Sequence, residues 1–315
     1  MTDLSKAAHK PVSSRDRASH LHRFLSEDPN VGVGRLHPTH PNGYEAIPGY
    51  QPGTRKPQTP RHQSISKLTY GAQPFRLQTG EAAPTQTQVT DTTLYPWRAN
   101  ALLRITVPHN IATFLATGWF IGPYAVVTAA HAVYPRQPGI YTGWASQIQV
   151  IPGLNGDSST PPFGSCSSNV FYCPVGWQTT GDLSLDYGVV LLSQGIGSQV
   201  GTYGYSTYSD GDLQSAVANL AGYPELKPDG SPAQGTQWYD SASIVSVDDS
   251  FVYYNMGTQS GESGSCVYRN IGDQRYAMAI HTAGPNDGTT DGLDRGLRII
   301  EPVFENLQQW ATMHG

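Results

Sequence analysis

A short turn rich in small residues is the first place in the sequence where chemistry can be expected. Thr258-Gln-Ser-Gly-Glu-Ser-Gly-Ser-Cys266 places Ser263 between Gly261 and Gly264. Glycine has no Cβ, so it lets the main chain turn sharply and approach a substrate closely. A serine hydroxyl here can attack a carbonyl carbon, and the N–H groups of Gly261 and Ser263 can hold the resulting oxyanion. Such turns also occur in ordinary hairpins, so the prediction depends on finding a base and an acid.

The chain contains a suitable base and a suitable acid. A serine nucleophile needs a histidine base, which in turn needs an orienting carboxylate. His131 follows two alanines at the end of an apolar strand, where small neighbours leave room for the imidazole to face a cleft. Asp186 directly precedes the apolar run 187–192, which is expected to be buried. Removing a carboxylate from water there costs free energy unless a partner pairs with it. Asp182 is the competing acid, but its polar loop favours simple solvation.

Short strands must position these residues. Runs rich in Val, Ile, Tyr and Thr recur between turn residues, which predicts an all-β barrel or sandwich. A helix is expected at 301–311, where Val303, Leu307 and Trp310 recur at helical spacing and Pro302 suits the first turn. Strands are expected at 101–107, 112–121, 125–128, 147–151, 187–192, 216–223, 236–247, 251–255, 265–269, 276–282 and 296–300.

The 315 residues divide into two parts of different composition. Residues 1–80 hold eleven Lys and Arg against five Asp and Glu, whereas the remainder holds eight against nineteen. Residues 1–88 are rich in Pro, Ser, Thr, Gln and His and show no periodic apolar pattern, so we expect a poorly structured segment. One short helix at 19–26 and an apolar patch at 65–75 are possible docking elements within it. Residues 89–315 form the expected globular domain.

Composition argues against several other classes of protein. The basic residues are diffuse and no apolar run spans a bilayer, so we expect neither a nucleic-acid surface nor a membrane anchor. Three cysteines are too few for a disulfide scaffold. Cys166 and Cys173 are spaced so that a disulfide between them could close a small ring, and Cys266 is expected to be a buried thiol. Asp287, Asp291 and Asp294 match no calcium loop, so no metal or cofactor is expected.

Three motifs together resemble those of the chymotrypsin-fold serine endopeptidases. They are Thr128-Ala-Ala-His131, Asp186-Tyr-Gly-Val-Val-Leu-Leu192 and Gly261-Glu-Ser-Gly-Ser265, within a resemblance that covers residues 89–311. The resemblance implies two six-stranded antiparallel β-barrels with the active site between them. It also implies that Ser263 is the nucleophile, His131 the general base and acid, and Asp186 the residue that orients His131.

One branch of that family, the bacterial glutamyl endopeptidases or V8-like enzymes, fits best. Residues 89–97, 221–224 and 279–282 resemble its segments. The resemblance assigns Thr258 and His281 to the pocket that holds the substrate side chain on the acyl side of the cut. A hydroxyl and an imidazole can bind a carboxylate without a permanently charged cation, which implies a preference for Glu, then Asp.

The resemblance also leaves several questions open. Glu262 stands where V8-like enzymes carry an uncharged residue, so it either receives a freed N-terminus, as an aspartate does in trypsin-like enzymes, or is solvated. The family implies that residues 1–88 are a propeptide and possible intramolecular inhibitor, cut between Arg76 and Val89, with Glu81 a candidate point. It implies a secreted monomer acting on proteins or peptides, although no secretory signal is visible. The alternatives are a protease of neutral specificity and a catalytically silent binding protein.

Overall fold

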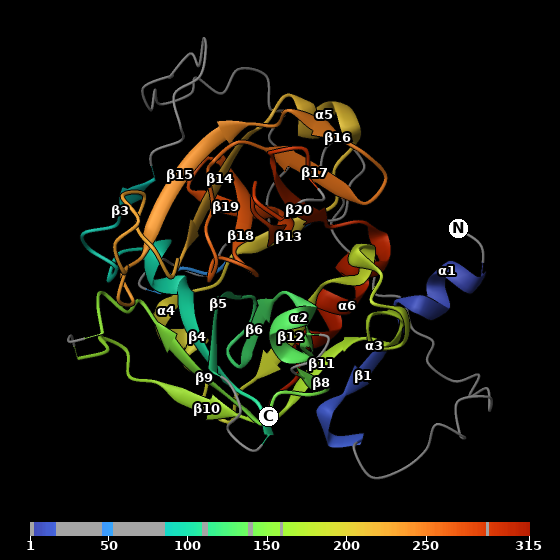
Figure 1. Cartoon of the computed structure of the whole chain (residues 1–315), viewed down its shortest axis with the longest axis horizontal. Coiled ribbons are helices and arrows are strands. Elements are labelled where there is room, and N and C mark those ends of the chain that lie inside the picture. Colours follow the sequence, from blue (N-terminus) through green and yellow to red (C-terminus); the bar gives the residue numbers. More distant parts are fainter. Residues whose placement is uncertain are drawn as a thin grey trace.

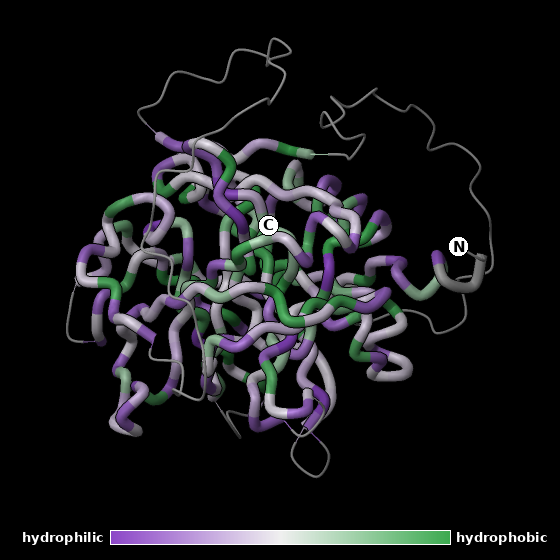
Figure 2. Tube along the Cα trace, turned by 90° about the horizontal axis from the view of Figure 1, so that it is seen from above, coloured by the Kyte–Doolittle hydropathy of each residue, from purple (hydrophilic) through white to green (hydrophobic). Residues whose placement is uncertain are grey.

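The computed structural model describes residues 3–16, 46–52, 86–108, 113–137, 141–157, 160–287 and 290–315. Two curled sheets form most of the molecule, the first in the lower half and the second in the upper half of Figure 1. Figure 2 shows hydrophobic segments mostly in the interior and hydrophilic residues mostly along the outer loops. This confirms the predicted all-β class. No helix in the described part of the chain is long and apolar enough to cross a membrane.

The first sheet is antiparallel throughout and carries the region around His131. Successive side chains along its strands point to opposite faces of the sheet. Leu103, Val126 and Val190 are fully buried in one apolar cluster of this sheet. In spatial order the strands are β1 (Pro11–Ser13), β11 (Phe171–Pro174), β12 (Gly188–Leu191), β6 (Ala125–Thr128), β5 (Thr113–Phe120), β4 (Asn100–Thr106), β9 (Gln147–Pro152) and β10 (Cys166–Ser168).

The second sheet carries the turn that contains Ser263. Its main path is antiparallel, and β13 (Gly204–Ser206) adds a parallel pairing with β19. The main path runs through β16 (Ser246–Val247), β17 (Phe251–Tyr254), β20 (Asp294–Arg298), β19 (Gln274–Ala283), β18 (Cys266–Ile271), β14 (Val217–Gly222), β15 (Trp238–Ser243) and β3 (Thr87–Gln88). A separate two-stranded hairpin pairs β7 (Arg136–Gln137) with β8 (Tyr141–Thr142).

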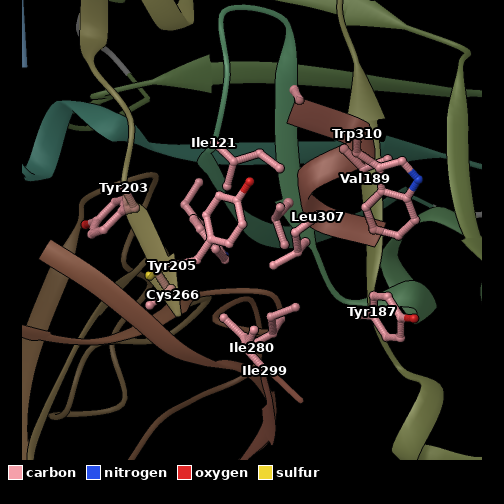
Figure 3. Close-up of a cluster of buried hydrophobic side chains, with 14 of the residues drawn as sticks. Ile121, Tyr187, Val189, Tyr203, Tyr205, Cys266, Ile280, Ile299, Leu307 and Trp310 are labelled. Carbon is pink, nitrogen blue, oxygen red and sulfur yellow. The ribbon is translucent and has the colours of Figure 1, made fainter. Parts of the chain in front are cut away.

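The apolar spacing predicted a C-terminal helix, and the structure has it as α6 (Glu301–Ala311), which joins the two sheets. It buries Val303, Leu307 and Trp310 in a cluster that includes Val189 of the first sheet and Ile280 of the second (Figure 3). Burying each large apolar side chain contributes about 2 kcal/mol, so this contact fixes one sheet against the other. The remaining helices are short: α1 (Asp3–Ala8), α2 (Ala130–Val133), α3 (Val175–Thr180), α4 (Gly197–Val200), α5 (Asp210–Gln214), η1 (Ser14–Asp16), η2 (Trp97–Ala99) and η4 (Leu183–Leu185).

Parts of the N-terminal segment are built into these sheets. β1 pairs with β11, and β2 (Ala46–Ile47) pairs with β13. His9 is buried: its Nδ1 lies 3.0 Å from the Tyr187 hydroxyl, and Asn306 of α6 donates to its carbonyl oxygen at 2.8 Å. These short strands help bring the sheets to eight and ten strands rather than six each. The predicted helix at 19–26, the patch at 65–75 and Glu81 lie outside the described residues.

All three cysteines are free and buried. The possible ring between Cys166 and Cys173 is absent, because β10 and β11 lie at different places in the first sheet and each thiol packs into its core. Cys266 is a buried thiol, as predicted, and burial raises its pKa well above the usual value. It is therefore inert at neutral pH.

Candidate active site

Asp186 holds His131 through two hydrogen bonds. One carboxylate oxygen accepts from the His131 main-chain N–H at 2.9 Å, and the other lies 2.7 Å from the ring Nδ1. β6 ends at Thr128 and leads into α2, which carries His131, while β12 pairs with β6 and follows Asp186. Asp186 is buried and the imidazole is about one-third exposed. The sequence prediction that these two residues meet is therefore confirmed.

This contact also sets the charge preference of His131. Burial acts to lower the pKa of the imidazole, but the charge and hydrogen bond of Asp186 raise it by more, and Asp287 adds to the rise. The pKa of His131 therefore lies above its ordinary value. A histidine of this kind accepts a proton readily and is stabilised once it carries the charge.

The turn at 261–264 packs directly against the strands that lead to His131. Thr117 of β5 donates its N–H to the carbonyl oxygen of Ser263 at 2.9 Å and its hydroxyl to that of Gly261 at 3.0 Å. Gly264 has φ +89°, and a Cβ there would lie 2.8 Å from the main-chain nitrogen of Ala129 and clash with Thr117 and Thr128. The fold thus brings the Ser263 turn onto the segment that carries His131.

Three amide groups of the turn at 261–265 are paired, and two have no acceptor among the described residues. Glu262, Gly264 and Ser265 each donate their N–H to a main-chain carbonyl, at 3.2, 2.7 and 3.0 Å. Those of Gly261 and Ser263, the predicted oxyanion donors, have no acceptor among the described residues. The left-handed backbone at Gly261, with φ +95°, makes this arrangement possible. Two free N–H groups beside a half-buried serine are what an oxyanion site requires.

Thr258 lies beside Asp294, for which the sequence alone predicts only a place in an acidic loop. The Asp294 carboxylate is fully buried at the start of β20. It accepts hydrogen bonds from the N–H groups of Met256, Gly257 and Thr258, at 2.5, 2.9 and 3.1 Å, and from the Thr258 hydroxyl at 2.6 Å. Asp294 therefore shapes the loop that precedes Ser263 and directs the Thr258 proton toward itself.

His281 lies on β19 and is fully enclosed. Its Nδ1 is 2.7 Å from the Tyr254 hydroxyl, and its carbonyl oxygen accepts the N–H of Gly264. Burial lowers the pKa of His281 to about 4; His131 and Arg295 act in the same direction, and the charge of Asp294 opposes them. The imidazole is therefore neutral at neutral pH. The main-chain bond to Gly264 ties the residue directly to the Ser263 turn.

Glu262 is buried rather than solvated, and its partner is Gln86, a residue that no sequence motif identifies. The Gln86 amide nitrogen lies 2.9 Å from each carboxylate oxygen of Glu262. Burial raises the pKa of Glu262 to about 8, although the N–H of Gln259 and the Gln86 amide act to lower it. The reading of Glu262 as a solvated residue is therefore wrong, because the turn folds its side chain inward.

No group of three or more His, Cys, Asp or Glu residues in the described ranges is placed to hold a metal ion. Asp294, one of the three loop acids considered for calcium, points into the 256–258 loop and is satisfied there by N–H and O–H donors.

The chain is similar to two known bacterial proteins. No protein-family model matches the sequence. The chain is 33% identical to the glutamyl endopeptidase of Bacillus licheniformis over 309 residues, which cover 96% of this chain and 88% of that protein. It is 37% identical over 228 residues to a Bacillus subtilis (strain 168) protein named extracellular metalloprotease, covering 72% of this chain and 68% of the relative.

Solved structures show the same fold. A Glu endopeptidase structure covers 73% of this chain and 98% of its own, with a TM-score of 0.61 and 24% identity. The protease Anisep from Arthrobacter nicotinovorans covers 72% and 99%, with a TM-score of 0.58 and 15% identity. The long match to the B. licheniformis enzyme establishes the family, and the structures establish the chymotrypsin-like fold. The chain belongs to the glutamyl endopeptidase family and is a serine endopeptidase of the chymotrypsin fold.

Proposed function

We propose that the chain hydrolyses peptide bonds through an acyl-enzyme on Ser263. His131 takes the hydroxyl proton as Ser263 attacks the scissile carbonyl carbon, and then gives it to the leaving amine. Asp186 orients the imidazole and stabilises its charged form. The observation that carries this proposal is the two-point contact of Asp186 with His131, next to a serine turn packed on Thr128 and Ala129.

The oxyanion formed in the attack is assigned to the N–H groups of Gly261 and Ser263. Both lack another acceptor among the described residues, so neither must break a bond in order to bind. Donors that are already oriented cost no reorganisation during the reaction, and loss of one such donor typically costs about 10²–10³ in kcat.

Specificity for Glu, then Asp, on the acyl side is proposed from His281. Burial and the charge of Asp294 raise the pKa of Tyr254 well above its usual range, so the phenol keeps its proton and can donate it to Nδ1 of His281. The neutral ring then carries its own proton on Nε2, where it can donate to a substrate carboxylate. The hydroxyl proton of Thr258 is committed to Asp294, which makes His281 the principal donor of the proposed pocket.

Residues 1–88 are proposed to act as a propeptide and intramolecular inhibitor of the protease domain at 89–315. Strand pairing of 11–13 and 46–47 with the protease sheets supports a close association. The name of the B. subtilis relative supports an extracellular site of action on protein or peptide substrates. We further propose that the protein is a monomer.

The proposed cut at Glu81 predicts that the Glu81→Gln variant accumulates uncut protein. Normal processing of that variant would contradict a cut at Glu81.

Labelling with a fluorophosphonate tests the assignment of the nucleophile. We expect one covalent adduct, mapped by mass spectrometry to Ser263 and absent from Ser263→Ala. Ser260→Ala is the matched control, because Ser260 is an exposed serine in the same turn and should leave labelling unchanged. An adduct elsewhere would contradict the assignment, and absence of any adduct would favour a silent binding protein.

A further inference from the structure

Gln86 and Glu262 are buried partners that are far apart in sequence. Gln86 is 5% exposed and Glu262 is fully enclosed. The Gln86 amide nitrogen lies at hydrogen-bonding distance from both carboxylate oxygens, and its own Oε1 has no partner among the described residues. One side chain from the segment before the protease domain therefore ends inside it, against the residue that precedes Ser263.

No Lys, Arg or His within the described ranges forms an ion pair with Glu262. The ionisable groups that bear on it are Asp240 of β15, Asp294 of β20 and Tyr254 of β17. None of these is cationic. The carboxyl group depends instead on neutral donors, namely the Gln86 amide and the N–H of Gln259 at 2.8 Å. A buried carboxyl group with so few donors is destabilised by the loss of any one of them.

Glu262 is also part of the framework of the serine turn. Its Oε2 accepts the N–H of Gln259, and its carbonyl oxygen accepts the N–H of Ser265. A Cβ on Gly222 of β14 would come within 3.1 Å of Oε1, so the side chain has little room to move. The orientation of the Glu262 side chain therefore determines the path of the chain from Gln259 to Ser265, which includes the proposed oxyanion donors.

Gln86 is held in place by the protease domain itself. The next two residues form β3, which pairs Thr87 with Tyr239 and Gln88 with Trp238 of β15. Val89 is buried and donates its N–H to the carbonyl oxygen of Gln237 at 2.8 Å. These contacts lie on the C-terminal side of residue 86, so they persist wherever the chain is cut before it.

We propose that Gln86 is a positioning residue, whose amide holds Glu262 and thereby the Gly261 and Ser263 N–H groups. This inference rests on the proposed function of that turn. It has two consequences for maturation. The turn is complete without a freed N-terminal amine at Glu262, because a side-chain amide already occupies that position. Any activating cut must leave Gln86 attached to the protease domain.

The positioning role of Gln86 can be tested with the purified, active enzyme and an ester substrate whose acyl residue is uncharged, called here the neutral ester. We expect Gln86→Ala to lower kcat by about 10- to 100-fold with little change in KM, since oxyanion donors act mainly in the transition state. Thr87→Ala is the matched control, because the neighbouring side chain is exposed, and should stay within about twofold. In a Glu262→Gln background, where no buried acid needs the donor, Gln86→Ala should cost less than about threefold.

The pH profile separates positioning from a purely structural role. Wild-type kcat should fall above about pH 8 as Glu262 loses its proton, and Glu262→Gln should remove that fall. N-terminal sequencing of active enzyme should find a first residue at or before position 86. Wild-type kcat in a folded Gln86→Ala variant, an equal loss in both backgrounds, or active enzyme that begins after Gln86 would overturn the proposal.

Failure of the proposed function would give a different result. If the wild-type protein hydrolyses no ester, the proposed protease activity is wrong, but the contact between Gln86 and Glu262 can still be measured. Thermal unfolding would then decide: Gln86→Ala should lower Tm in the wild-type background and change it much less in Glu262→Gln. Equal changes in Tm would reject the pairing itself.

Discussion

The carboxylate of Asp186 contacts His131 at two points, its main-chain N–H at 2.9 Å and its ring Nδ1 at 2.7 Å. The first contact fixes the start of α2 and the second fixes the orientation of the ring. Both hydrogen bonds are accepted by the buried carboxylate of Asp186. The imidazole therefore cannot rotate without breaking its hydrogen bond to that carboxylate. An imidazole held this way is preorganised for its proposed role as the proton acceptor of Ser263.

Asp186→Asn tests this contact. The amide can still accept from the main-chain N–H of His131, but its NH₂ group forces the wrong tautomer at Nδ1. We expect kcat to fall by about 10³–10⁴ with little change in Tm. Asp182→Asn, at the competing acid, should keep kcat within about twofold. Equal effects of the two substitutions would contradict the role of Asp186.

Gly264→Ala tests the packing of the serine turn on the first sheet. The new methyl group would clash with Thr117 and Thr128 at a residue with φ +89°. We expect a loss of about 3 kcal/mol in the free energy of unfolding, together with loss of activity. Gly272→Ala is the control, since Gly272 has φ +57° but no atom within 4 Å, and should cost about 1 kcal/mol. Urea unfolding of both variants measures the difference.

Glu262 makes stability depend on pH in a definite direction. Burial raises its folded pKa to about 8 from an ordinary value of 4.5. The folded state therefore keeps a proton that the unfolded state releases, so this stabilising contribution is complete below 4.5 and is lost as pH rises through 8. Relative to Glu262→Gln, wild type should lose on the order of 5 kcal/mol of stability across that range. Parallel stability curves for the two proteins would contradict the burial of the acid.

His281 should give a preference for Glu that does not change with pH above neutral. Burial holds the pKa of the ring at about 4, so the neutral ring keeps its Nε2 proton, and the ratio of kcat/KM for a Glu ester to that for a neutral ester should stay level as pH rises above neutral. His281→Gln should lower kcat/KM for the Glu ester by about 100-fold and that for the neutral ester by less than about threefold. Tyr254→Phe, which removes the bond to Nδ1, should give an intermediate loss. A ratio that falls as pH rises through neutral would contradict a neutral donor, because it would mean that the ring must be charged to bind the carboxylate.

The fold was largely predictable because its strands and last helix carry strong local signals. The apolar run 187–192 and the helical spacing of Val303, Leu307 and Trp310 each identify an element without knowledge of the rest of the chain. β10 and β13 were missed because they are three residues long and rich in Ser and Gly, so their pairing depends on neighbours distant in sequence.

The candidate site was predictable only in part, for a related reason. His131, Asp186 and Ser263 stand in motifs that can be read locally. Gln86 and Asp294 have no such motif: their roles come from partners 176 and 36–38 residues away. Only the closed sheets bring Gln86 to Glu262 and Asp294 to the 256–258 loop, so no pattern within the sequence could have identified them.

Digestion of an unstructured protein, with every cut mapped by mass spectrometry, tests the proposed nucleophile and the specificity pocket in one experiment. We expect cuts after Glu, fewer after Asp, and none by Ser263→Ala prepared in the same way. Cuts mainly after other residues would retain the serine endopeptidase but contradict the role of His281. Cuts that persist in Ser263→Ala would contradict the mechanism itself.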